Sequence, residues 1–95
     1  MEAEGRRGLT ALVVDDEENI VHVLTTLLAQ EGFGVAAAQT GEEALERIRS
    51  EVVDLVLLDV RLPGRDGIEV LEAVKAHRPD CSVLMMTAFG SVESA

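Results

Sequence analysis

The chain has few of the residues on which many protein scaffolds and metal centres depend. It contains one cysteine and neither tryptophan nor tyrosine, and aromatic residues make up 2% of its 95 residues. The single thiol, Cys81, can form no intramolecular disulfide, and it excludes both a disulfide framework and a zinc cluster. We therefore expect one small domain whose core is built from aliphatic side chains.

Basic residues are also scarce. Eight Lys and Arg stand against 18 Asp and Glu, which gives a formal net charge of −10 at pH 7. Non-specific binding to nucleic acid relies on Lys and Arg that neutralise phosphates, so this balance argues against it and favours cations as ligands. No apolar run approaches the roughly 20 residues of a membrane span, and the N-terminal residues Met1–Arg7 contain no apolar stretch of the kind found in a signal peptide. These absences predict a cytoplasmic protein without a membrane partner.

Four short apolar runs recur along the chain. Each has the length of a strand, and none alternates with polar residues, which is typical of strands that are covered on both faces of a parallel sheet. Because buried helices can also lack alternation, the segments around the runs decide in favour of strands. The runs are Ala11–Val14, Val35–Ala38, Leu55–Leu58 and Val83–Met86.

Helical patterns separate these runs. Thr40 with Glu43, and Asp66 with Glu69, have the spacing of capping boxes that open two helices. An earlier helix before Gly32 has one apolar stripe at i, i+3, i+4, i+7 and i+8, which consists of Ile20, Val23, Leu24, Leu27 and Leu28. The alternation of strands and helices predicts an α/β fold with a doubly wound parallel sheet.

Three carboxylates follow the predicted strands at the point where each ends. Asp15 and Asp16 come directly after the first strand, and Asp59 directly after the third. A single Asp in such a place is ordinarily a helix N-cap. A strand order of 2-1-3-4, however, would bring all three acids into one crevice at the carboxyl edge of the sheet. Oxygen ligands of this kind select a hard cation, and Mg²⁺ is the expected cofactor.

Three segments resemble the signature blocks of response-regulator receiver domains, in the same order and with similar spacing. They are Leu12–Glu17, Asp59–Gly67 and Thr87–Ala88. The longer block Thr87–Ala95 further resembles the NtrC-type branch, whose members activate transcription. The resemblance implies a flavodoxin-like fold of the CheY-like superfamily, and a phosphoacceptor signalling domain of a two-component system rather than an enzyme.

The resemblance also implies a role for each matching residue. Asp59 would be the phosphoacceptor that takes a phosphoryl group from a sensor histidine kinase. Asp16 would bind Mg²⁺ directly, Asp15 mainly through water, and the backbone carbonyl of Arg61 would be a further ligand. Thr87 would donate its hydroxyl to the phosphoryl group and so report phosphorylation to the adjacent loop.

The sequence departs from the family pattern at its C-terminal end. Family members carry a lysine and a switch aromatic on a fifth strand, whereas the only lysine here, Lys75, falls on the predicted third helix. We interpret residues 1–95 as one receiver domain that is incomplete at its C-terminus and ends in a loop and the first turn of a helix. The fourth strand would then be an open sheet edge, which favours a homodimer or the exchange of elements between copies.

Two other functions compete with this interpretation. Without the family lysine, the domain could be a receiver-like interaction module that binds partners and is not phosphorylated. A phosphatase with an Asp nucleophile, as in the haloacid dehalogenase family, would need a second acid two residues after Asp59. That position is Arg61, which removes the general acid.

Overall fold

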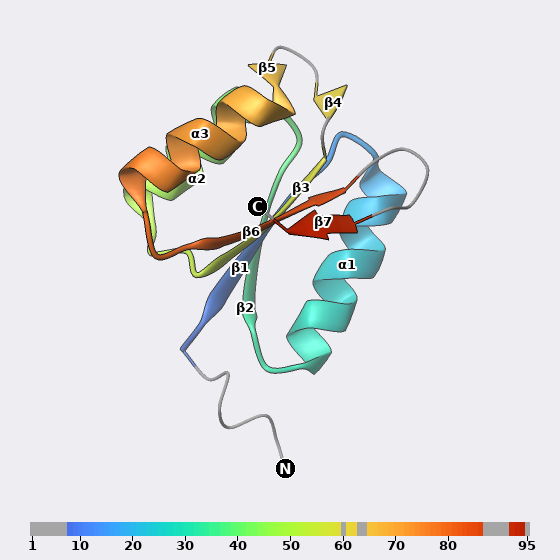
Figure 1. The fold of residues 1–95 in the computed structure, drawn as a ribbon. Helices are drawn as coiled ribbons and strands as arrows, with labels where there is room; N and C mark the ends of the chain where they lie inside the picture. Colours follow the sequence, from blue (N-terminus) through green and yellow to red (C-terminus); the bar gives the residue numbers. More distant parts are fainter. Residues whose placement is uncertain (1–7, 60, 63–64, 87–91, 95) are drawn as a thin grey trace.

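The computed structural model describes residues 8–59, 61–62, 65–86 and 92–94, and within them the predicted parallel sheet is confirmed. Four parallel strands lie side by side in the order β2-β1-β3-β6, which is the predicted order 2-1-3-4 (Figure 1). Each strand is within one residue of its predicted apolar run at either end. The bounds are Thr10–Val14 for β1, Gly34–Ala38 for β2, Leu55–Asp59 for β3 and Ser82–Met86 for β6.

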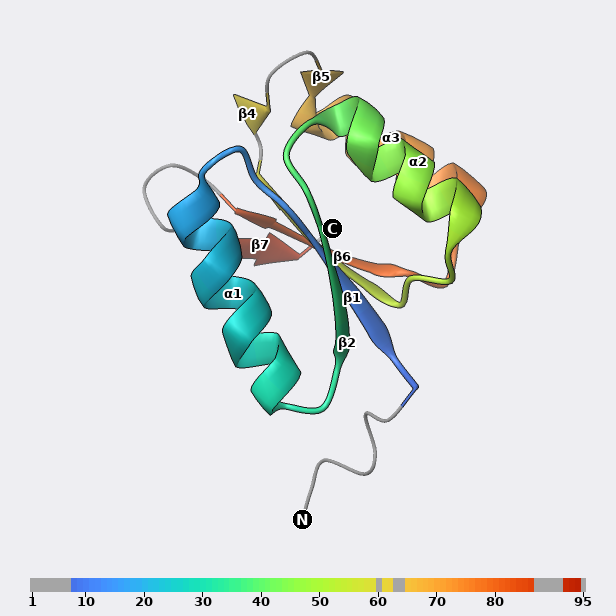
Figure 2. The same cartoon turned by 180° about the vertical axis from the view of Figure 1, so that it is seen from behind.

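Within the residues that the structure describes, three helices cover the sheet. Helix α1 (Glu18–Gln30) lies on one face, and α2 (Gly41–Ser50) and α3 (Gly67–His77) lie together on the other (Figures 1 and 2). No helix in the described part of the chain is long and apolar enough to cross a membrane. The inner strand β1 lies between β2 and β3 and is covered on both faces, which agrees with an apolar run that does not alternate with polar residues.

The helix ends follow the chemistry of the sequence. Thr40 caps α2, because its hydroxyl accepts the backbone N–H of Glu43 at 3.1 Å. The Glu43 carboxylate accepts the N–H of Gln39 at 2.8 Å, one residue before the N-cap. The Thr40 half of the predicted capping box is therefore confirmed, and its Glu43 half bonds one residue further back than the motif requires. Gly32 adopts a φ of 99° just past α1, and the N–H groups of Gly32 and Phe33 close a Schellman motif on the last turn.

The main core lies between the sheet and the pair α2–α3. It joins side chains from four strands to the apolar sides of these two helices, and the largest fully buried members include Leu12, Ile48 and Leu58. Met85 of β6 is buried there as well.

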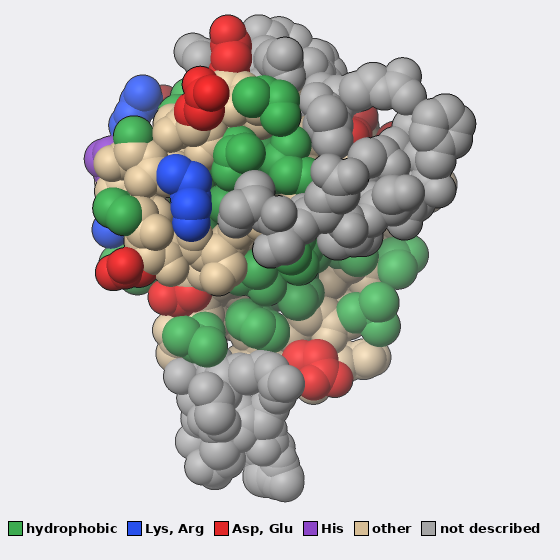
Figure 3. Space-filling view, in the orientation of Figure 1, with side chains coloured by type: hydrophobic (Ala, Val, Ile, Leu, Met, Phe, Trp, Pro, Cys, Tyr) green, Lys and Arg blue, Asp and Glu red, His purple; other side chains and the backbone are tan. Residues whose placement is uncertain are grey.

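The opposite face is less completely covered. Helix α1 has no buried residue, and its apolar stripe is exposed at Ile20 (38%), Val23 (51%) and Leu27 (53%). Apolar side chains are visible at the surface over this helix (Figure 3). The stripe that the sequence predicts is therefore present, but only part of it packs against strands β1 and β2.

The C-terminal end of the chain differs from its prediction. Residues Val92–Ser94 form β7, which pairs antiparallel with β6, whereas the sequence predicted the first turn of a helix. The prediction that the fourth strand is an open edge is therefore wrong, because Leu84, Met85 and Met86 all have partners in β7. An antiparallel neighbour needs only a short connection, so the chain can return to cover this edge directly.

A second small element was also not predicted. Strands β4 (Arg61–Leu62) and β5 (Arg65–Asp66) form an antiparallel pair between β3 and α3. This pair leads the chain from β3 into α3, which begins at Gly67, directly after Asp66.

Candidate functional site

Three carboxylates meet at the carboxyl edge of the sheet, as the sequence predicts. One oxygen of each of Asp15, Asp16 and Asp59 lies within 4.8 Å of the others. The register explains this, because Val14 of β1 pairs with Leu58 of β3 and the next residue of each strand is an aspartate. The three side chains differ in exposure: Asp15 is buried, Asp59 is half-buried and Asp16 is exposed.

The backbone fixes the most buried of the three acids. The N–H of Asp15 donates to the carbonyl of Ala38 at 3.0 Å, which extends the ladder between β1 and β2 by one bond. One carboxylate oxygen of Asp15 accepts the N–H of Glu17 at 2.9 Å. This contact was not predicted, although an Asp that bonds the N–H two residues on is a common turn signal. It orients Asp15 at the start of α1.

The cluster is electrostatically unfavourable without a counter-charge. Burial raises the pKa of Asp15 above its ordinary value, and the hydrogen bond from the Glu17 N–H opposes this. The negative charges of Asp59, Asp16 and Glu17 raise the pKa of Asp15 further. Like charges held this closely persist mainly where a cation compensates them.

The donor set fits a hard divalent cation. All three ligand atoms are carboxylate oxygens, and one of the acids is exposed, which leaves room for water in the coordination sphere. Mg²⁺ binds in this manner, with one or two carboxylates and several waters. Nitrogen or sulfur ligands, which would favour zinc, do not contribute to this cluster of described residues.

The other predicted site residues lie along the chain around this cluster. Arg61 is in β4, two residues after Asp59, and its backbone is paired with Asp66. Thr87 lies outside the described residues, but Met86, which precedes it, pairs in register with Asp59. Lys75 is remote from the cluster, because its ammonium donates to the carbonyl of Cys81 at 2.6 Å, beside the start of β6.

Comparison with known families decides what this arrangement is. The sequence family described as the response regulator receiver domain matches residues 11–95 of this chain. The chain belongs to the response regulator receiver domain family. It is a receiver of the NtrC-type branch, as the C-terminal block predicts, and it is a signalling domain rather than an enzyme. The haloacid dehalogenase alternative is therefore excluded.

Individual relatives agree with this assignment. The receiver is 49% identical to the transcriptional regulatory protein ZraR of Escherichia coli (strain K12) over 88 residues, which are 93% of this chain and 20% of ZraR. It thus spans about a fifth of that relative's length.

Solved structures show the same fold. A CheY-like receiver from Methanospirillum hungatei has a TM-score of 0.83 at 35% identity, covering 87% of this chain and 66% of that one. The regulator TrrA from Thermotoga maritima has a TM-score of 0.79 at 40% identity, covering 84% of this chain and 70% of that one.

Proposed function

We propose that this receiver accepts a phosphoryl group on Asp59 from a sensor histidine kinase, with Mg²⁺ in the acidic cluster, and that the change of conformation controls an output such as transcription. The observation that carries the proposal is the convergence of three carboxylate oxygens within 4.8 Å at one sheet edge. Related structures support it: TrrA is described in complex with Mg²⁺ and BeF, and also with the histidine kinase ThkA.

The transfer uses one carboxylate oxygen as the nucleophile. The Asp59 oxygen forms a bond to phosphorus while the bond from phosphorus to the kinase histidine nitrogen breaks, and the electron pair of that bond stays on the imidazole. The product is an acyl phosphate on Asp59. Asp59 is half-buried at the end of β3, so part of its surface is accessible from solvent.

The neighbouring residues would bind Mg²⁺ and contact the phosphoryl group. Asp16 would bind Mg²⁺ directly, Asp15 mainly through water, and the Arg61 carbonyl would complete the protein ligands. When bound, the ion would neutralise negative charge on the phosphoryl oxygens, in a transfer that depends chiefly on position and electrostatics. Thr87 would donate its hydroxyl to the phosphoryl group, and its predecessor Met86 is paired with Asp59.

An interaction module that is not phosphorylated is the second candidate. It is favoured by the position of Lys75, whose ammonium contacts the carbonyls of Pro79 and Cys81. Those carbonyls precede β6, whereas Asp59 pairs with Met86 at the far end of the same strand. The only lysine of the chain therefore supplies no positive charge to the acidic cluster.

Beryllofluoride and acetyl phosphate, each with Mg²⁺, distinguish the two candidates. We expect beryllofluoride to shift the amide resonances of Asp59 and Met86, and acetyl phosphate to add the mass of one phosphoryl group. Asp59→Asn should abolish both responses, while Asp80→Asn, which removes an equal charge from an exposed turn, should leave them unchanged. A wild-type chain that shows neither response would establish the interaction module instead.

A further inference from the structure

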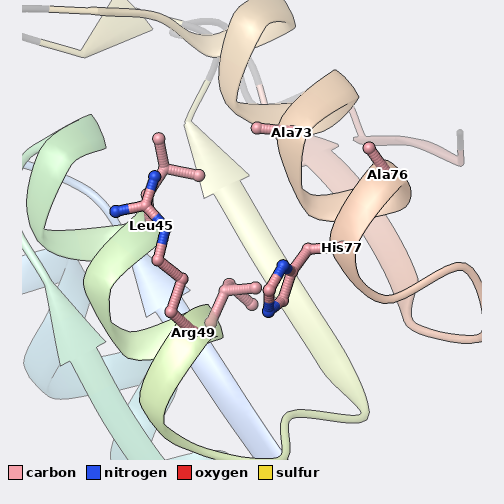
Figure 4. Close-up of a pocket in the computed structure, with 6 residues that line it drawn as sticks. Leu45, Arg49, Ala73, Ala76 and His77 are labelled. Atoms are coloured by element: carbon pink, nitrogen blue, oxygen red, sulfur yellow. The ribbon is translucent and has the colours of Figure 1, made fainter.

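A groove between the C-terminal halves of α2 and α3 lies away from the acidic cluster. It encloses about 260 Å³ and has an apolar floor of Leu45 and Ile48, both buried in the core. Ala73 and Ala76 of α3 form the opposite wall, and their small side chains leave the space open (Figure 4). Pockets for small molecules usually hold about 300–1,000 Å³, so this groove suits a single side chain better than a cofactor.

The side chains of one arginine and one histidine border the groove. Arg49 extends along α2 beside Leu45, and His77 reaches from the end of α3 toward α2 (Figure 4). Within the described part of the chain, neither side chain makes an ion pair or a hydrogen bond. This is unusual in a chain in which acids outnumber Lys and Arg by 18 to 8.

The other bases at this end of the molecule are already engaged. Arg47 forms an ion pair with Glu51 at 2.7 Å, and Arg78 donates to the Glu51 carbonyl at 2.9 Å. Lys75 donates to the carbonyl of Cys81. The guanidinium of Arg49 is therefore available to a ligand of the groove, whereas the neighbouring basic side chains are bonded within the fold.

We propose that this groove binds an acidic segment of a partner protein, which inserts one apolar side chain between α2 and α3 and places carboxylates on Arg49 and His77. The charge of the groove border favours carboxylates, and its apolar floor favours a leucine-like side chain. The net charge of −10 opposes an acidic partner at long range, so the contact depends at short range on the guanidinium of Arg49 and on the ring N–H of His77 as a hydrogen-bond donor.

The ordinary role of Arg49 and His77 would be to offset the negative ends of two helix dipoles. That role predicts an effect on stability but no binding.

A peptide titration separates the helix-dipole role from ligand binding. The peptide is capped and has one leucine between paired glutamates, and its binding is monitored through the amide resonances of the protein. We expect the amide resonances of the groove residues alone to shift as the peptide is added up to about 5 mM. The dissociation constant should be in the millimolar range. Peptides with glycine for leucine or lysine for glutamate should bind less or not at all.

Variants test the two halves of the site separately. Arg49→Gln should weaken peptide binding about two- to fivefold, as expected for one exposed ion pair, whereas Arg47→Gln removes an equal charge that is already paired with Glu51 and should not. Ala76→Leu should fill the groove and abolish binding, while Ala29→Leu makes the same change on the exposed side of α1. Asp59→Asn should bind normally, because the groove does not use the phosphoacceptor.

Three results would overturn the proposal. Equal shifts with the glutamate and lysine peptides would show that charge plays no part. The absence of shifts in the groove at the highest glutamate peptide concentration would leave only the helix-dipole role. Shifts of the groove residues that depend on protein concentration, without peptide, would identify a second copy of the chain as the occupant.

Discussion

The face of the sheet under α2 and α3 and the face under α1 are covered to different extents. Beneath α2 and α3, side chains such as Ile48 and Val74 are almost inaccessible to solvent. On the other face, α1 buries no residue completely, and Leu27 and Val23 are about half exposed. The comparison indicates that the α2–α3 layer supplies most of the hydrophobic stability, since burial and not apolar character alone contributes free energy.

Truncation of one aliphatic side chain on each face should give the largest difference. Ile48→Ala removes a side chain that is 1% exposed and should lower the free energy of unfolding by about 2–5 kcal/mol. Leu27→Ala, at 53% exposure, should cost less than about 1 kcal/mol. Urea denaturation followed by circular dichroism measures both.

A small domain can fail to fold after such a truncation. Ile48→Val, which should cost about 0.5–1.5 kcal/mol, then replaces the larger change. Equal losses at positions 48 and 27 would contradict the comparison and would mean that α1 is covered in solution.

The sequence predicts the well-covered parts of the molecule better than the exposed ones. The four parallel strands are predicted to within a residue, because a strand buried on both faces appears as an unbroken apolar run. The strand β7 at Val92–Ser94 is not predicted, because it has no apolar run and depends on pairing with β6. The stripe on α1 shows which side of the helix is apolar but not what covers it, so the exposure of Val23 could not be predicted.

The acidic site was more predictable than the fold around it. Asp15 and Asp59 follow strands that pair directly, so the strand order alone brings them together. The hydrogen bond from Glu17 to Asp15 depends on the local turn, which the spacing of apolar residues does not encode. The engagement of Lys75 with the Cys81 carbonyl depends on the tertiary fold and has no sequence signal.

Two threonines, one that caps α2 and one in the middle of α1, provide a smaller contrast between the two faces. Thr40→Ala removes the hydroxyl that caps α2 and should cost about 1 kcal/mol, within a usual range of 0.5–2 kcal/mol. Thr26→Ala removes an exposed threonine from the middle of α1, where alanine favours the helix, and should change the free energy of unfolding by at most about 0.5 kcal/mol. Thermal and urea denaturation of both variants test this, and a cost at Thr26 as large as that at Thr40 would contradict it.

The smallest effect concerns the thiol beneath α3. Cys81 is 2% exposed, and burial raises the pKa of its thiol above the ordinary value of 9.0, although the positive charges of Lys75 and Arg78 oppose this rise. The folded chain therefore keeps the thiol neutral at a pH where the unfolded chain ionises it. Its contribution to stability is complete below pH 9.0 and is lost as the pH rises through the raised pKa.

A disulfide reagent that reports free thiols should consequently react slowly with the folded chain and completely after denaturation. Above pH 9.0, the wild-type chain should lose stability with pH more steeply than Cys81→Ala, which has no thiol to ionise. The α1 face provides the matched control, because Ala29→Cys would place a thiol at an exposed position of that helix and should react at once in the folded state. Rapid reaction of Cys81 without denaturation would mean that the α2–α3 layer opens readily. The two faces would then differ in how exposed their side chains are in the native structure, but not in stability.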